Sequence, residues 1–309
     1  MFFSIVIPVY NRETHIGRAV ASALAQTFSD YEVILVDDCS TDNSLAVMQG
    51  FAAPNVRIVT RDTRGGVGGA RNTGIAVARG DWIVFLDSDD ELVPGGLDIM
   101  FERASAAPDD VDGLWFRCQM DDGQIIPARL TAPQEWDYTG FLAFWNANSR
   151  QWRDMVYCIR RHSFTLLPQP EGRMDDIKYL IDFAFRFRIR AYPEILRLYH
   201  QDADNQLVRV TRRLDPRRDH AFIADRANEY RRLIADHRTA LAHQAPTLYG
   251  EYLESAATTA TMANRRWEAV RYASTALRLS PLRLRNWVVL AAAFVGPFAV
   301  LLRRWTSHG

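Results

Sequence analysis

The residues most able to do chemistry are three carboxylates crowded into four positions after an apolar run. Asp87, Asp89 and Asp90 follow the run at 82–86. Carboxylates this close repel one another unless a cation or hydrogen bonds compensate. Mg²⁺ or Mn²⁺ bound to diphosphate oxygens would compensate, because these ions favour few carboxylates together with phosphate and water. An acidic turn that caps the next helix is the alternative, and these residues alone leave both interpretations open.

Two further motifs have residue types that bind nucleotides. Asp37 and Asp38 end another apolar run, where one carboxylate can accept hydrogen bonds from a base N–H or a ribose hydroxyl, or can cap a turn. The glycine-rich segment 65–69 precedes Arg71, and backbone amides at the start of a helix attract phosphate. Because this segment matches neither G-x-G-x-x-G nor the P-loop, it is only a weak indication of a dinucleotide site.

These motifs must be positioned by a folded domain, and the first hundred residues predict its type. Buried strands are predicted at 3–10, 31–36, 56–59 and 82–86, alternating with helices that begin near 14, 44 and 70. This alternation predicts an α/β fold with a mainly parallel sheet covered by helices on both faces. Ligands bind such sheets where the strands end, which is where the acidic residues lie.

After residue 110, the sequence patterns that predict strands and helices are less regular. The predicted elements are strands at 112–119, 124–127 and 155–160, a helix at 175–190 and a strand at 195–199. Trp136, Trp145 and Trp152 lie in this part of the chain. Core packing and stacking on the sugar rings of an acceptor are both open interpretations of these side chains.

The last third of the sequence differs in charge. Residues 186–309 carry 21 Arg against 11 acidic residues, whereas residues 1–100 carry 7 Arg against 13. Helical spacing broken at Pro246 and Pro281 predicts Arg-rich helices, so we expect a catalytic domain at 1–212 and a helical region at 213–309. Lys plus Arg and Asp plus Glu both total 37, and this zero net charge argues against a nucleic-acid partner.

Two features indicate where the protein works. The segment 287–302 has no charged side chain but is shorter than the roughly 20 residues of a spanning helix, and Gly296-Pro297 would kink it. We expect it to contact the membrane surface, with burial in protein or a true span as alternatives. The three cysteines have neither disulfide nor metal spacing, which indicates a reducing compartment. We therefore expect a cytoplasmic protein at the inner face of the cytoplasmic membrane.

The order of the motifs resembles that of the family 2 glycosyltransferases. The matching stretches are Ser4-Ile-Val-Ile-Pro-Val-Tyr-Asn11, Val36-Asp-Asp-Cys-Ser-Thr-Asp42, Gly69-Ala-Arg-Asn-Thr-Gly74 and Gly80-Asp-Trp-Ile-Val-Phe-Leu-Asp-Ser-Asp-Asp90. The resemblance is dense over 3–100 and looser over 150–205. It implies the GT-A fold, an α/β domain that binds a nucleotide-sugar, and a UDP-sugar is the expected donor.

The resemblance also implies roles for residues of the donor site. Asp38 would hold the base, Pro8 and Tyr10 would line the base pocket, and Arg71 would approach the base or the diphosphate.

Asp87 and Asp89 match the family's DxD motif, with Asp89 as the direct ligand of Mn²⁺ or Mg²⁺. His200 stands where family members carry a basic residue near the diphosphate or the metal. A hydrogen-bonded or solvated histidine is the alternative.

The catalytic base of the family is the Asp of a Glu-Asp pair that follows a glycine-containing loop. Here the corresponding segment is Pro170-Glu-Gly-Arg-Met-Asp-Asp-Ile177. Asp175 replaces the Glu and Asp176 matches the base, which would take the proton of the acceptor hydroxyl as that oxygen attacks the anomeric carbon. Both acids would also suit the start of the helix predicted at 175–190.

We therefore expect an inverting, metal-dependent glycosyltransferase that acts on a glycan or lipid-linked acceptor in bacterial surface polysaccharide assembly. Processive polymerases of the family carry Gln-x-x-Arg-Trp and spanning helices. Here Gln206-Leu-Val-Arg209 is followed by Val210, which favours a non-processive enzyme. A nucleotidyltransferase is an alternative, although residues 8–17 lack its basic glycine-rich loop. An inactive module that binds sugar nucleotides or polysaccharide is another.

Overall fold

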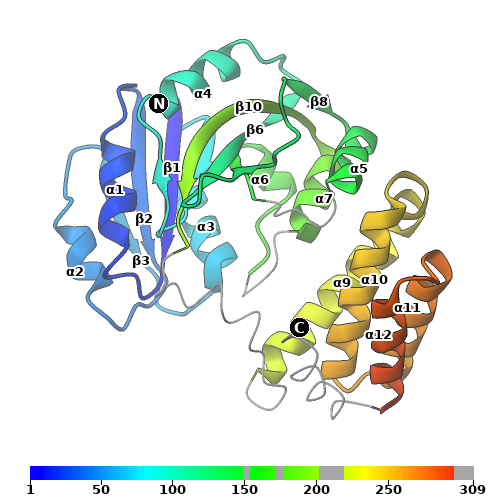
Figure 1. The fold of residues 1–309 in the computed structure, drawn as a ribbon. Helices are drawn as coiled ribbons and strands as arrows, with labels where there is room; N and C mark the ends of the chain where they lie inside the picture. Colours follow the sequence, from blue (N-terminus) through cyan, green and yellow to red (C-terminus); the bar gives the residue numbers. More distant parts are fainter. Residues whose placement is uncertain (149–153, 172–176, 202–218, 296–309) are drawn as a thin grey trace. The chain divides into compact units, whose positions relative to one another are not determined.

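The computed structural model describes residues 1–148, 154–171, 177–201 and 219–295, and the chain divides into two compact units (Figure 1). The first unit comprises Met1–Gly140 and Arg150–Asn205, and the second comprises Phe141–Ser149 and Gln206–Gly309. The domain boundary predicted between 212 and 213 lies outside the described residues, as do Trp152, Asp175 and Asp176.

The first unit begins with four parallel strands connected by helices. The strands are β1 (Phe3–Val9), β2 (Tyr31–Asp37), β3 (Val56–Thr60) and β4 (Trp82–Phe85), adjacent in the order β3-β2-β1-β4. The connecting helices are α1 (Ile16–Leu24), α2 (Ser44–Gln49) and α3 (Gly66–Val77). The α/β class predicted from the alternating pattern is therefore confirmed.

The sheet continues beyond β4 as a mixed sheet in the order β9-β6-β10-β5. The further strands are β5 (Glu91–Leu92), β6 (Val111–Met120), β7 (Ile125–Ile126), β8 (Gln134–Trp136), β9 (Val156–Arg160) and β10 (Arg188–Tyr199). Strand β9 runs antiparallel to both β4 and β6, and β10 runs parallel to β6. The other helices in this stretch of the chain are α4 (Gly96–Ser105), α5 (Tyr138–Ala147), α6 (Ser163–Leu166) and α7 (Ile177–Arg186), and α5 belongs to the second unit from Phe141 on.

Strand β1 is buried on both faces, which explains its continuous apolar sequence. Phe3, Ile5 and Ile7 belong to one core cluster with the apolar side of α1. Burial of each of these side chains stabilises the fold by about 1.5–3 kcal/mol. On the other face, a Cβ at Gly74 of α3 would lie 2.5 Å from Val6 Cγ1. Only glycine permits that close approach, so Gly74 sets the distance between α3 and the sheet.

The helix predicted at 175–190 was too long at its C-terminal end. Helix α7 ends at Arg186, and strand β10 begins at Arg188 and runs through Pro193. Ile189 and Ala191 alternate into the core, a period of two that belongs to a strand. Pro193 is tolerated because the pairing of β10 with β6 shifts register between Tyr192 and Ile195.

Besides the part of α5 from Phe141 on, the described residues of the second unit form four helices. They are α9 (His220–Gln244), α10 (Pro246–Met262), α11 (Arg266–Leu279) and α12 (Leu284–Val295). Their breaks at Pro246 and Pro281 agree with the sequence. Ala260, Ala269 and Ala293 form a core cluster whose small side chains let the helix backbones approach closely. No helix among the described residues is long and apolar enough to cross a membrane.

The tryptophans of the mixed region are core residues where they are described. Trp136 is 2% exposed and Trp145 is 3% exposed. The Trp115 ring contacts the Trp136 ring edge-on, with centroids 6.0 Å apart. Such buried rings offer no open face to an acceptor sugar.

Candidate active site

The parallel strands bring the predicted donor residues to one edge of the sheet. Tyr10 follows the end of β1, Asp38 follows the end of β2, and Asp87 comes two residues after the end of β4. Because these three strands are adjacent and parallel, their carboxyl ends lie side by side (Figure 1). This is the edge at which open α/β sheets bind ligands.

Arginines from separate elements surround the acidic turn 87–90. Asp87 Oδ1 lies 3.3 Å from Arg71 Nη2 of α3, and its Oδ2 lies 3.3 Å from Arg197 Nη1 of β10. Asp89 Oδ2 lies 3.8 Å from Arg12 Nη2. The repulsion expected from the sequence is therefore balanced in part by guanidinium groups, and a bound metal is not the only source of positive charge.

Arg18 fixes the backbone of the same turn. Its Nε donates to the carbonyl oxygen of Asp89 at 2.8 Å. The amide of Asp90 donates to the carbonyl of Asp87 at 3.2 Å, which closes the turn. The turn is thus held in shape through its main chain as well as its side chains.

Arg197 is the site residue that the sequence reasoning missed. Its side chain is 3% exposed, and besides Asp87 it contacts Asp90 Oδ2 at 3.4 Å and Asp154 Oδ1 at 2.6 Å. Its position in the sequence could have indicated this role, because Arg197 is a charged residue inside the apolar run Ile195-Leu-Arg-Leu-Tyr199. A charge buried in this way requires partners.

Burial and charge act in opposite directions on this cluster. Burial raises the pKa of Asp90 to about 8, although Arg197 lowers it. Burial by itself lowers the pKa of Arg197, but Asp154, Asp90 and Asp87 outweigh burial and hold that pKa well above the ordinary value. Arg197 is therefore a permanent cation on which three acidic side chains converge.

We predict that Arg197→Met lowers the free energy of unfolding by about 3 kcal/mol, because it leaves the buried Asp90 and the partly buried Asp87 and Asp154 without their cation. The measurement is urea unfolding at neutral pH. Arg103→Met is the matched control, because Arg103 contacts Glu194 at 2.5 Å with a side chain that is 36% exposed. A pair so exposed contributes about 0–1 kcal/mol. Equal and small losses for both variants would contradict the proposed role of Arg197.

The carboxylate of Asp38 organises the glycine-rich segment. Its Oδ1 accepts a hydrogen bond from Gly65 N and its Oδ2 one from Gly66 N, both at 2.8 Å. Arg61 Nε lies 3.1 Å from Oδ1, and the Asp38 side chain is 3% exposed. Base recognition by Asp38 stays a prediction. It requires the base to bind the carboxylate together with the two glycine amides and Arg61, or to replace one of them.

The neighbouring positions frame the predicted base pocket. Pro8 lies in β1, paired with Val36 of β2. The Tyr10 ring is covered by the guanidinium of Arg64, whose Cζ lies 3.6 Å from the ring centroid. A planar cation on the ring marks the face on which a nucleobase would stack, so Arg64 must move if Tyr10 receives the base.

Helix α3 begins earlier than predicted, at Gly66, so most of the glycine-rich segment is its first turn. Gly68 allows a close approach, because a Cβ there would lie 1.7 Å from the carbonyl oxygen of Pro170. Asn72 and Gln169 add two hydrogen bonds, from Asn72 Nδ2 to Gln169 O at 2.8 Å and from Gln169 N to Asn72 Oδ1 at 3.0 Å. Gln169 and Pro170 are thereby held against α3.

His200 is held by carboxylates on both ring nitrogens. Nδ1 lies 2.6 Å from Asp121 Oδ1 and Nε2 lies 2.8 Å from Glu91 Oε1. Its backbone amide donates to Asp90 Oδ1 at 3.0 Å. His200 therefore lies beside the acidic turn, and metal binding by its ring would require one of these contacts to break.

The acidic turn offers the kind of ligands that Mg²⁺ and Mn²⁺ take. Asp87 and Asp89 present carboxylate oxygens, with side chains that are 32% and 14% exposed. Within the described ranges, no group of three or more His, Cys, Asp or Glu side chains could hold an ion by itself. A site with few protein ligands fits an ion that shares its coordination with phosphate and water.

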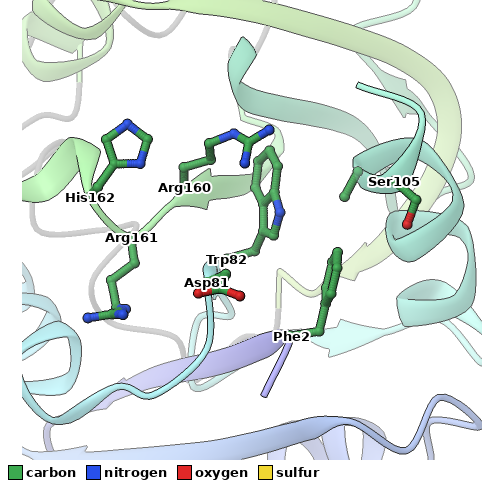
Figure 2. Close-up of a pocket in the computed structure, with 8 residues that line it drawn as sticks. Phe2, Asp81, Trp82, Ser105, Arg160, Arg161 and His162 are labelled. Atoms are coloured by element: carbon green, nitrogen blue, oxygen red, sulfur yellow. The ribbon is translucent and has the colours of Figure 1, made fainter. Parts of the chain in front are cut away.

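A separate cavity lies at the opposite edge of the sheet. Its volume is about 310 Å³. Figure 2 shows side chains that line it, among them Phe2, Trp82, Arg160, Arg161 and His162. The Arg160 guanidinium lies over the Trp82 ring at 4.6 Å. Because Trp82 begins β4 whereas Asp87 follows its end, this cavity is not part of the candidate active site.

A mainly parallel α/β sheet with an acidic turn at the carboxyl ends of its strands is typical of enzyme domains that bind a ligand at that edge. Residues 4–166 match the model of glycosyl transferase family 2. This match spans more than half of the chain, and the chain belongs to that family.

Individual relatives agree with this assignment. The succinoglycan biosynthesis protein ExoO of Rhizobium meliloti is 49% identical over 102 residues, which is 33% of this chain and 29% of that protein. The UDP-Glc:alpha-D-GlcNAc-diphosphoundecaprenol beta-1,3-glucosyltransferase WfgD of Escherichia coli is 30% identical over 45% of this chain and 54% of that protein. The chain thus matches about a third to a half of the length of these relatives.

The fold of the chain is similar to that of a solved structure over nearly its full length. S. aureus TarS 1-349, in complex with UDP-GlcNAc, superimposes with a TM-score of 0.62 and 16% identity, covering 94% of this chain and 91% of that chain. At this identity the likeness concerns the fold, and it extends to the helices that follow the sheet domain.

Proposed function

We propose that this protein is an inverting, metal-dependent, non-processive glycosyltransferase. It moves a sugar from a UDP-sugar to a glycan or lipid-linked acceptor in the assembly of bacterial surface polysaccharide. The observation that carries the proposal is the acidic turn 87–90 at the carboxyl end of β4, shaped by Arg12, Arg18, Arg71 and Arg197. A rigid acidic turn at this edge suits a donor whose diphosphate arrives with a divalent cation.

The named relatives support the substrate classes. TarS was solved with UDP-GlcNAc, and the name of WfgD specifies a UDP-sugar donor and a lipid diphosphate acceptor. The name of ExoO places that protein in the biosynthesis of a bacterial polysaccharide. Carried over to this chain, these names favour a UDP-sugar donor and an acceptor attached to a membrane lipid.

Separate sets of residues bind the donor and activate the acceptor. Asp38, Pro8 and Tyr10 bind the base, and Arg71 approaches the base or the diphosphate. Asp176 takes the proton of the acceptor hydroxyl while that oxygen forms a bond to the anomeric carbon and the bond to the diphosphate breaks.

Asp89, with Asp87 beside it, would hold Mn²⁺ or Mg²⁺, and His200 would join them only after giving up a carboxylate contact. When bound, the ion supplies positive charge for the departing nucleoside diphosphate. Arg71 and Arg197 hold Asp87 in place from two sides.

A lipid-linked acceptor would require the enzyme to work at the cytoplasmic face of the membrane. We propose a catalytic part that ends near residue 212, followed by a helical part that makes a peripheral membrane contact. Residues 287–295 of the apolar segment belong to α12, whereas 296–302 lie outside the described residues.

The proposed class can be tested by donor hydrolysis. We expect the protein to release UDP from a UDP-sugar in the presence of Mn²⁺ or Mg²⁺, and to lose this activity in EDTA. The assay screens several UDP-sugars, with the ADP- and GDP-sugars as controls. Release of pyrophosphate from UTP and a sugar phosphate would instead indicate a nucleotidyltransferase. Donor binding without any turnover, with acceptor extracts present, would indicate an inactive binding module.

A further inference from the structure

Helix α12 presents an apolar stripe to the outside of the second unit. The stripe consists of Leu284, Trp287, Val288, Ala291 and Phe294, all of which are exposed. These positions follow the spacing i, i+3, i+4, i+7 and i+10, which places them on an arc of roughly 120° of one helix face. Leu284 is 76% exposed, Trp287 53% and Phe294 49%, so this face is not part of the protein core.

The opposite face of α12 is firmly attached to its own unit. Val289 is 4% exposed and Ala293 1%. Asn286 Nδ2 donates to the carbonyl oxygens of Ala276 and Ser280, both at 3.0 Å. The stripe therefore faces outward because α12 is fixed to α11, and not because the helix end is loose.

Two ion pairs add to this attachment. Glu254 of α10 is 2% exposed, and its carboxylate lies 2.7 Å from Arg283 Nη1 and 3.1 Å from Arg285 Nε. A buried carboxylate that contacts two arginines anchors the start of α12. The stripe is thus a preformed surface that needs no folding step before it binds.

The stripe itself carries no polar group that requires water. The indole N–H of Trp287 donates to the carbonyl oxygen of Pro281 at 2.9 Å, so the polar part of that side chain is already satisfied. Leu282, just before α12, is a further exposed apolar residue, at 99%. Single exposed apolar residues are ordinary, but a continuous stripe of them marks an interaction surface.

The charge around the stripe favours an anionic partner. Residues 269–309 contain six arginines and no acidic residue. Arg283 and Arg285 share the single carboxylate of Glu254, and Arg303 and Arg304 lie outside the described residues. The described residues 269–295 therefore keep an excess of positive charge, and the same segment of a second copy would bring no carboxylate to balance it. An anionic bilayer offers both an apolar interior for the stripe and negative head groups for the arginines.

We infer that the stripe 284–294 of α12 is the surface by which this protein lies on an anionic membrane, with the helix parallel to the bilayer plane. From Leu284 to Phe294 the helix extends about 15 Å, which suits an in-plane contact and not a span. The inference names the surface for the membrane contact in the proposed function and to that extent rests on it. It concerns a part of the chain that is separate from the candidate active site.

The test is flotation of the full chain with phosphatidylglycerol–phosphatidylcholine vesicles. We expect the native protein to float, and Val288→Asp/Phe294→Asp to reduce its partition coefficient by about tenfold or more, because charge must be removed from the apolar layer. Leu166→Asp is the matched control, because Leu166 is 67% exposed in the first unit, and it should float like the native protein. Unchanged thermal melting would establish that both variants are folded.

Three outcomes would overturn the inference. One is that neither the native protein nor the α12 variant floats. Another is that both float equally. The third is that the native protein is a dimer without vesicles and the variant is a monomer, since a second copy would then cover the stripe. Metal-dependent UDP release is measured on the same preparations. A native protein that releases UDP but does not float would count against the stripe alone, whereas absent UDP release from the native protein would count against the proposed enzyme class.

Discussion

Replacement of Asp89 by alanine is expected to reduce metal-dependent release of UDP by about a thousandfold, which corresponds to about 4 kcal/mol of lost transition-state stabilisation. Asp89 lies on a turn whose backbone is held by Arg18, so the side chain can be removed without displacing the main chain. The measurement is the rate of UDP release across a Mn²⁺ titration. Circular dichroism reports whether the fold is retained.

Asp109→Ala serves as the control for this prediction. Asp109 is exposed and lies just before β6, at the edge of the sheet opposite to the acidic turn, so its loss should leave the rate unchanged. Near-normal UDP release by the Asp89 variant, with an intact spectrum, would show that the acidic turn does not carry the donor chemistry.

Replacement of Asp176 by asparagine is expected to remove sugar transfer while donor binding survives. A base acts on the acceptor hydroxyl, and its loss costs about 10²–10⁴-fold in rate. Affinity for the UDP-sugar, measured by calorimetry, should remain because no donor contact depends on that proton acceptor.

Asp175→Asn is the matched variant for this second prediction. The two acids are adjacent, so both substitutions change the charge of the segment equally and only one removes the base. If Asp175→Asn is the inactive variant, the base is one residue earlier. Loss of donor binding with residual transfer would exclude the role for both positions.

Most of the first half of the fold followed from local patterns. Apolar runs and helical spacing identified β1, β2 and β4 nearly to their ends, because strands buried on both faces are mainly apolar. The boundary between α7 and β10 was predicted less well. Residues 187–192 suit either element locally, and it is pairing with β6 and β8 that makes them a strand.

The candidate site was predictable in its position but not in its contacts. The acids at the ends of adjacent strands had to meet at one edge of the sheet. The sequence contained no indication that Asp38 is engaged by Gly65 and Gly66, or that His200 lies between Asp121 and Glu91. These contacts depend on the paths of loops, for which no periodic pattern exists.

The sequence by itself determined the α/β class, the family resemblance and the identity of the acids at the strand ends, because these depend on local residue order. Only the tertiary structure decided how the acids are compensated. Asp87 and Arg197 are 110 residues apart, and the sequence around either residue gives no indication that the two form a pair. A buried charge must find its partner within a few ångströms. Which residue becomes that partner depends on which strands are neighbours in the sheet. The compensation of charge in the site is therefore a property of the tertiary structure.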